Sequence, residues 1–180
     1  VANWRVTKYF NPNTEYHHTD GIGTKGIYHL QKRSFENAVI DALAMNLNDL
    51  AIEGAVPYGL VDHLLMPEED VKAIYEIMEN LSKECVKRNI AITGGETAIH
   101  NNMEGLEISI TMLGYLNNPP KINKFRVGDM LIGLESSGLH SNGFTRIREL
   151  YGNGFCPEFI VPTYIYLDLI LDICSEFKIY

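Results

Sequence analysis

A glycine-rich turn between an acid and a base is the first segment of this sequence whose residue types and spacing suggest chemistry. It reads Asp20-Gly21-Ile22-Gly23-Thr24-Lys25. The glycines let backbone N–H groups approach an anion, the lysine brings a compact positive charge, and the aspartate can hold a hard cation. We therefore expect a local phosphate and metal site here, with an ordinary hairpin turn as the alternative.

The same turn matches a dinucleotide-binding spacing by chance. Gly21, Gly23 and Gly26 satisfy G-x-G-x-x-G. A dinucleotide-binding unit needs a helix that opens at the third glycine and an acid at the end of the next strand. Here a strand is expected after the turn, and Asp41 falls inside a helical pattern. We therefore do not expect NAD binding.

A second candidate is a polar stripe on an otherwise apolar helix. Apolar side chains surround the predicted helix 35–54, which begins after a serine and ends at a glycine. At 100° per residue, Asp41, Asn48 and Asp49 fall within about a quarter-turn of one another. Such oxygen ligands suit Mg²⁺, which takes one or two carboxylates together with water and phosphate oxygens. A hydrogen-bonded polar seam between packed helices is the alternative.

Two polar loops complete the set of candidate sites. Gly94-Gly95-Glu96-Thr97 follows the predicted strand 90–93, and its glycines allow a ligand to approach the backbone closely. The loop 136–143 stands between a predicted strand and a helix whose free N–H groups attract anions. His140 in that loop can act as an acid, a base or a hydrogen-bond donor, although a lone histidine is more often structural.

The elements that must position these residues alternate between strands and helices, which predicts one α/β architecture with a mixed sheet covered by helices on one face. The expected strands are 14–19, 26–30, 57–65, 90–93, 106–116 and 130–134. The expected helices are 35–54, 67–88, 144–151 and 164–177, with a loop at 117–120 and a boundary at 157–162. Cys85 falls on the core face of the second helix and is interpreted as a packing residue.

Composition excludes several classes of protein. The 180 residues carry a formal net charge of -8, and no long run of Lys and Arg occurs, which argues against a nucleic-acid partner. The apolar stretch 160–173 is shorter than the roughly 20 residues of a membrane-spanning helix, so no membrane segment is expected. The start of the chain shows no secretion signal. Three widely spaced cysteines favour neither a disulfide framework nor a zinc site, and they predict a reducing, cytoplasmic location.

Five motifs in order resemble the aminoimidazole ribonucleotide synthetase family, also called phosphoribosylformylglycinamidine cyclo-ligases. They are the segments 19–25, 45–50, 94–98, 136–143 and 162–166. Selenophosphate synthetase, thiamine-monophosphate kinase, the hydrogenase-maturation dehydratase and the formylglycinamide amidotransferase share the first two motifs. The third and fourth look like the cyclo-ligase. The resemblance implies an N-terminal ATP- and Mg-binding domain over residues 1–156, a homodimer formed through its sheet, and the start of a truncated or absent second domain over 157–180.

The implied reaction is an ATP-dependent ring closure in purine synthesis that converts formylglycinamidine ribonucleotide to aminoimidazole ribonucleotide. ATP phosphorylates an amide oxygen, a neighbouring nitrogen attacks that carbon, and phosphate leaves. The implied Mg²⁺ ligands are Asp20 and Asp49, and the implied catalytic residues are Lys25 and His140. The implied ATP contacts are Gly21, Gly23, Thr24, Lys25, Asn48, Gly95, Glu96 and Thr97. The implied contacts of the phosphoribosyl substrate are Ser137, His140, Ser141 and Asn142.

The sequence also departs from the family pattern. Residues 1–18 contain no glycine, whereas the family begins with a glycine-rich segment, and after Ala98 the chain reads Ile-His-Asn-Asn-Met where the family usually has Glu-Met-Pro-Gly. The chain is expected to be a fragment, a split subunit or a half-length relative. Two alternatives stay open: another ATP-dependent enzyme of the superfamily, and a non-catalytic nucleotide-binding half that needs a separate chain.

Overall fold

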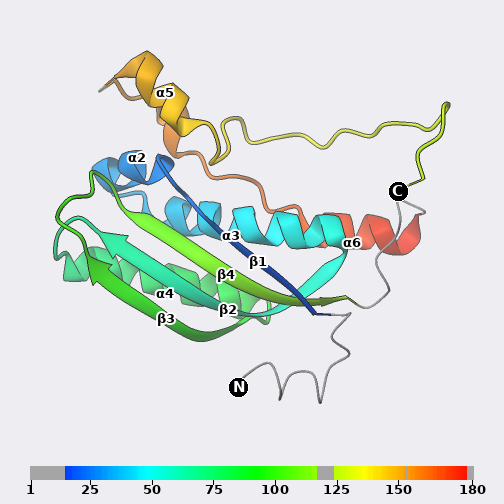
Figure 1. Cartoon of the computed structure of the whole chain (residues 1–180), viewed down its shortest axis with the longest axis horizontal. Coiled ribbons are helices and arrows are strands. Elements are labelled where there is room, and N and C mark those ends of the chain that lie inside the picture. The colour runs from blue at the N-terminus through cyan, green and yellow to red at the C-terminus, as the bar shows by residue number, and fades with distance from the viewer. Residues whose placement is uncertain (1–14, 117–123, 153, 178–180) are drawn as a thin grey trace.

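A four-stranded mixed sheet with two long helices on one face forms the centre of the computed structural model, which describes residues 15–116, 124–152 and 154–177 (Figure 1). The strands are β1 (Glu15–Gly21), β2 (Ala55–Met66), β3 (Ala91–Ile99) and β4 (Glu107–Leu116). The helices are α2 (Lys25–Lys32), α3 (Phe35–Glu53), α4 (Val71–Lys87), α5 (Phe144–Tyr151) and α6 (Leu167–Glu176), with a short 3₁₀ helix, η1 (Pro157–Ile160). The expected α/β fold class is confirmed.

The sheet has the order β1-β4-β2-β3. β4 lies antiparallel to both β1 and β2, while β2 and β3 are parallel, which requires a crossover connection, and α4 provides it. Alternate residues of β4 are buried against the helices, as the alternating sequence predicts. β3 has a strand neighbour on one side only among the described residues.

α3 is the central element of the core. Most of its side chains are buried, because α4 and the sheet pack on part of its surface while α2, α6 and the segment before α6 pack on the rest. Gly54 has φ 71° and closes the helix in the left-handed conformation that the glycine was expected to adopt. α4 begins with the Asp70 carboxylate accepting a hydrogen bond from the Ala73 N–H at 2.9 Å. Cys85 is buried in the same core, as predicted.

Three expectations about secondary structure are corrected. Residues 26–30 form the helix α2 and not a strand, because Gly26 lies against the Leu106 backbone and the segment buries one helical face against α3 and η1. Residues 130–134 are extended but pair with no strand among the described residues. β3 continues through the Gly-Gly-Glu-Thr motif, which was expected to be a loop. The expected loop 117–120 lies outside the described residues, as does Thr14 of the first expected strand.

A dinucleotide-binding site needs a helix that opens at the third glycine, and α2 does begin there, so this objection to such a site does not hold. The other objection holds, because Asp41 lies inside α3. β1 also has no parallel neighbour in the described sheet, where it pairs only with β4, antiparallel. A dinucleotide-binding unit requires parallel strands joined by a helix. Within the described ranges, no helix is both long and apolar enough to cross a membrane.

Candidate functional site

One cavity of about 280 Å³ collects five of the predicted site residues from three distant parts of the chain. Asp20 comes from β1, Asn48 and Asp49 from α3, and His140 and Asn142 from the loop before α5. The remaining lining residues are Ala44, Met45, Ile52, Tyr166 and Ile170. Carboxylates, amides and an imidazole thus face apolar walls, an arrangement typical of small-molecule sites.

Asp20 and Asp49 lie at this cavity with different hydrogen-bond partners. The Asp20 carboxylate accepts from the Gly21 N–H at 2.7 Å. Asp49, whose side chain is 46% exposed, lies 2.7 Å from the Nε2 atom of His18. Two carboxylates at one cavity fit the ligand set of Mg²⁺, with water and phosphate oxygens completing the shell. Among the described residues, no group of three or more His, Cys, Asp and Glu side chains could hold a metal by itself.

His18 is a neighbour of the site that the sequence analysis missed. Its Nδ1 atom lies 3.0 Å from the Asn46 Oδ1 atom, while the Asn46 amide donates to the Asp20 carbonyl at 3.1 Å. Both ring nitrogens of His18 face oxygen atoms, so the ring bridges Asn46 and Asp49. Nothing in the spacing of residues 18, 46 and 49 showed this, since the contact depends on how β1 packs on α3.

Lys25 does not line the cavity. Its side chain is fully buried, and its Nζ atom lies 2.8 Å from the Asp41 Oδ2 atom and donates to the Val161 carbonyl at 2.7 Å. Asp41 is buried too and accepts from His29 Nε2 at 2.8 Å and from both the N–H and the hydroxyl of Thr163 at 2.8 Å. Burial alone would raise the pKa of Asp41, but the hydrogen bond from His29, the charge of Lys25 and the N–H of Thr163 together hold it below its ordinary value.

The glycine turn lies against a carboxylate of the protein itself. A Cβ on Gly21 would meet the carboxylate of Glu107 on β4, while the Ile22 N–H donates to the Ile108 carbonyl at 3.3 Å. Burial raises the pKa of Glu107, although the Ser109 hydroxyl and the backbone of Gly23 and Ile22 oppose the rise. In this structure the Glu107 side chain fills the space beside Gly21, and the phosphate site expected at this turn stays a prediction.

Thr24 and Asn48 are both held by other side chains or by backbone. The Thr24 hydroxyl lies 3.1 Å from the hydroxyl of Thr145 on α5. The Asn48 amide donates to the Tyr164 carbonyl at 2.9 Å, and its oxygen accepts from the Tyr166 N–H at 2.8 Å. Asn48 therefore lines the cavity while it fixes the segment before α6.

Gly95, Glu96 and Thr97 are not part of this cavity. They lie on the edge strand β3, where Gly95 pairs with Asp62 and Glu96 with His63 of β2. A Cβ on Gly95 would meet the Asp62 carboxylate, so close packing explains that glycine. Burial raises the pKa of Asp62.

The loop 136–143 carries buried polar atoms that have no hydrogen-bond partner among the described residues. These are Ser137 Oγ, His140 Nε2 and Ser141 Oγ. Asn142 makes a long contact of 3.9 Å with the Met45 sulfur. Buried ring nitrogens normally find partners, and because His140 lines the cavity, its free nitrogen suits a polar ligand there.

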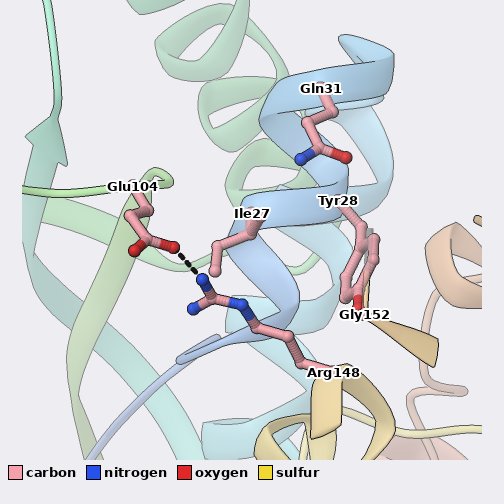
Figure 2. Close-up of a pocket in the computed structure, with 6 residues that line it drawn as sticks. All are labelled: Ile27, Tyr28, Gln31, Glu104, Arg148 and Gly152. Carbon is pink, nitrogen blue, oxygen red and sulfur yellow. Dashed lines mark hydrogen bonds and ion pairs between the residues drawn. The ribbon is translucent and has the colours of Figure 1, made fainter. Parts of the chain in front are cut away.

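A second, smaller cavity of about 80 Å³ lies between α2, α5 and Glu104 (Figure 2). Ile27, Tyr28 and Gln31 line it from α2, and the Arg148 guanidinium forms an ion pair with Glu104 across its edge. None of the predicted site residues lies there. Because its two charges already neutralise each other, this cavity is the weaker candidate.

Comparison with protein families matches residues 11–116 to the family described as AIR synthase related protein, N-terminal domain. The curated phosphoribosylformylglycinamidine cyclo-ligase of Saccharolobus solfataricus is 35% identical over 168 residues, which cover 89% of this chain and 52% of the relative. The enzyme of the same name from Thermococcus kodakarensis is 36% identical over 176 residues, covering 90% of this chain and 53% of the relative. The chain thus spans about half the length of these curated relatives.

Solved structures share the fold at lower identity. Thiamine monophosphate kinase from Aquifex aeolicus has a TM-score of 0.59 at 16% identity and covers 96% of this chain and 61% of that chain. The hydrogenase maturation protein HypE of E. coli has a TM-score of 0.55 at 19% identity and covers 88% of this chain and 49% of that chain. These likenesses concern the fold alone.

Proposed function

This chain belongs to the family of AIR synthase related proteins, and from that membership we propose that its whole protein is an ATP-dependent cyclo-ligase of purine biosynthesis. The proposed reaction converts formylglycinamidine ribonucleotide to aminoimidazole ribonucleotide. Support comes from the family match and from relatives named as cyclo-ligases at about one third identity. The observation that carries the proposal is the cavity where Asp20, Asp49, His140 and Asn142 meet.

Asp20 and Asp49 are the proposed ligands of Mg²⁺. When bound, the metal would neutralise phosphate charge and orient the phosphates of ATP. Gly21, Gly23 and Thr24 would offer N–H and hydroxyl donors to the same phosphates, which requires Glu107 to leave the turn. Asn48 would shape the nucleotide side of the cavity through its hydrogen bonds to the backbone of Tyr164 and Tyr166.

His140 is the proposed catalytic residue, and Ser137, Ser141 and Asn142 are the proposed contacts of the phosphoribosyl substrate. The unpaired buried atoms of Ser137, His140 and Ser141 suit hydrogen bonds to an amide and to ribose phosphate oxygens, and Asn142 lines the same cavity as His140. In the reaction, the amide oxygen attacks the γ-phosphorus and ADP leaves. The neighbouring nitrogen then attacks the carbon that carries the phosphorylated oxygen. The bond between that carbon and the oxygen breaks, phosphate departs, and the attacking nitrogen loses its proton. Holding amide and nucleotide at one cavity makes this transfer intramolecular in effect.

The edge strand β3 supports the proposed homodimer. Nearly all its residues are exposed, and its outer backbone groups face no other strand in the described part of the chain. An exposed edge of this kind is a template for pairing with a second strand. In such a dimer Gly95, Glu96 and Thr97 would lie near the interface, where we propose that they contact the nucleotide.

The exposed apolar segment before the His140 loop supports a further domain or a separate chain beside this one. It runs alone across the molecule in Figure 1, and Val127, Met130, Leu131 and Ile132 are each at least three-quarters exposed. A run of apolar side chains in water is unfavourable and marks a surface that another part covers. The division at residues 156 and 157 into an ATP-binding domain and the start of a second domain belongs to the same proposal, as does a cytoplasmic location.

Titration with MgATP and with formylglycinamidine ribonucleotide, followed by an assay for phosphate release, tests the proposal. Asp49→Asn should reduce Mg²⁺-dependent nucleotide affinity at least tenfold, and His140→Ala should weaken substrate more than ATP. Asp172→Asn, an exposed change on α6, is the matched control and should change neither. Unchanged affinities in both site variants would remove this cavity from the function.

Two other functions remain as alternatives. Another ATP-dependent enzyme of the family would release ADP with a different substrate, and a solved relative whose title names thiamine monophosphate kinase motivates that comparison. A nucleotide-holding half would bind MgATP without releasing phosphate until a partner chain is added. The assay separates these outcomes by the substrate and by the chain that phosphate release requires.

A further inference from the structure

Three polar residues on one line of α3 hold the segment 160–166, which we name the strap. The Asn37 amide donates to the Ile160 carbonyl at 2.9 Å, Asp41 accepts twice from Thr163, and Asn48 binds the Tyr164 carbonyl and the Tyr166 N–H. At 100° per residue, positions 37, 41 and 48 lie within about 40° of one another on the helix. Of the predicted stripe, Asp41 and Asn48 therefore form a polar seam, whose partner is the strap and not a helix, while Asp49 contacts His18 at the cavity.

Asp41 and Lys25 connect this seam to the His140 loop. The Lys25 Nζ atom contacts the Asp41 carboxylate, the Val161 carbonyl at 2.7 Å and, more loosely, the Leu139 carbonyl at 3.5 Å. One ammonium group thus joins α2, α3, the strap and the residue next to His140.

The strap and the loop form two walls of the candidate cavity. Tyr166, the last residue of the strap, lines it with Ile170 of α6, and His140 and Asn142 line it from the loop. The Tyr166 hydroxyl also donates to the Glu135 carbonyl at 2.7 Å, at the start of the loop. Neither wall belongs to the helix-covered sheet, so its position depends on contacts such as those of Lys25 and Asp41.

Stability alone does not explain a buried charged group in this place. A buried ion pair costs more desolvation than an apolar pair of the same size, and it is often no more stabilising. Among the described ion pairs, only those of Asp41 with Lys25 and His29 have both side chains fully buried. What the charges add over apolar packing is a fixed geometry for four segments.

We infer that Asp41, Lys25 and Thr163 are positioning residues that set the strap and the His140 loop at the candidate cavity. The Asp41 carboxylate orients the Lys25 ammonium and the Thr163 backbone. Lys25 and Thr163 in turn fix the distance between the strap and the His140 loop, and this distance sets the width of the cavity that a ligand enters. The inference rests on the proposed function only in taking that cavity as the ligand site.

Hydrogen exchange in the full 180-residue chain without ligand tests this inference. Thr163→Val removes one donor to Asp41 at nearly constant volume, and Thr163→Ser restores it. Thr111→Val removes the hydroxyl contact between Thr111 and Thr19 on the other face of the sheet and is the matched control. Thr163→Val should speed exchange of the Tyr166 amide, which donates to Asn48, at least tenfold, and it should shift the amide NMR signals of residues 137–142. Thr163→Ser and Thr111→Val should leave that exchange within twofold of the natural chain and the loop signals in place.

Two results would overturn the inference. Unchanged amide NMR signals at 137–142 in Thr163→Val would show that the loop is held independently of the strap. An equal rise in exchange across α4 and β2 would show a general loss of stability instead of positioning. Because this readout needs no nucleotide, a natural chain that binds no MgATP would refute the proposed function and leave the exchange result to decide the inference.

Discussion

The helix-covered sheet and the segment from residue 124 to 166 are built on different principles. In the sheet layer, alternate residues of β4 and one face of α4 bury apolar side chains in one continuous core. In the later segment, residues 124–142 contain no helix or strand, and large apolar side chains such as Leu131 face solvent. The first region is held by one large apolar core. The second is held by a small aromatic cluster, in which Phe144 and Phe159 pack on Tyr28 of α2, and by a few specific polar contacts.

This difference has a functional consequence. The rigid layer supplies Asp20 and Asp49, the two proposed metal ligands, while the later segment supplies His140, Asn142 and Tyr166. The reaction between nucleotide and substrate would therefore take place at the boundary between the helix-covered sheet and the segment 124–166, whose walls at the cavity are oriented by a few hydrogen bonds. Variants that act on one region alone can test whether the two are separable.

Replacing Lys25 should have the largest effect. Lys25→Met leaves the buried Asp41 carboxylate without its cation, and removing one partner of a buried pair typically costs about 3–5 kcal/mol. Lys83→Met breaks the exposed pair with Glu79 and should cost less than about 0.5 kcal/mol. Urea unfolding measures both free energies, and equal costs for the two variants would contradict the account of the Lys25–Asp41 contact.

A pair of glycine variants sharpens the comparison. A Cβ on Gly26 would collide with the Leu106 carbonyl, so Gly26→Ala should cost about 1–3 kcal/mol through overpacking against a backbone that cannot yield easily. Gly133, in the exposed segment, has nothing within 4 Å of its Cβ position, and Gly133→Ala should leave the free energy of unfolding nearly unchanged. Thermal unfolding of the two variants would refute the contrast if Gly133→Ala were the more damaging.

Much of the sheet layer could be predicted from the sequence because its signals are local. The glycine at 54 and the apolar residues before it predict α3 to within one residue. The segment 67–70 and the helical periodicity after it predict α4, which begins four residues later than expected, at Val71. β4 follows from strict alternation. α2 was missed because Ile27 and Tyr28 favour a strand and Gly26 disfavours a helix, and tertiary packing overrides these preferences.

The candidate cavity was only partly predictable. Motifs identified Asp20, Asn48, Asp49, His140 and Asn142, and the structure brings these five together. The partners of Lys25, the bridge made by His18 and the carboxylate of Glu107 in the turn could not be predicted. Each depends on contacts between residues far apart in sequence, for which a single sequence carries no periodic or spacing signal.

Two buried aspartates offer the finest test, because acid acts on them in opposite directions. Burial would raise the pKa of Asp41, but His29, Lys25 and Thr163 lower it below its ordinary value, so its contribution to stability is present above about pH 4 and is lost as pH falls further. In Asp62 of the sheet, burial raises the pKa, so the folded chain takes up a proton earlier than the unfolded chain does. Asp62 therefore favours folding increasingly as pH falls toward its ordinary value.

Acid unfolding curves of Asp41→Asn and Asp62→Asn should thus diverge, each measured relative to its own stability at pH 7. Asp41→Asn should lose less stability than the natural chain below pH 4, and Asp62→Asn should lose more above it, by at most about 1.4 kcal/mol for each pH unit and each proton. The windows differ because one pKa is lowered and the other is raised. If both variants shifted the acid unfolding curve in the same direction, Asp41 and Asp62 would have similar electrostatic environments. The contrast between the two regions would then not extend to their charged groups.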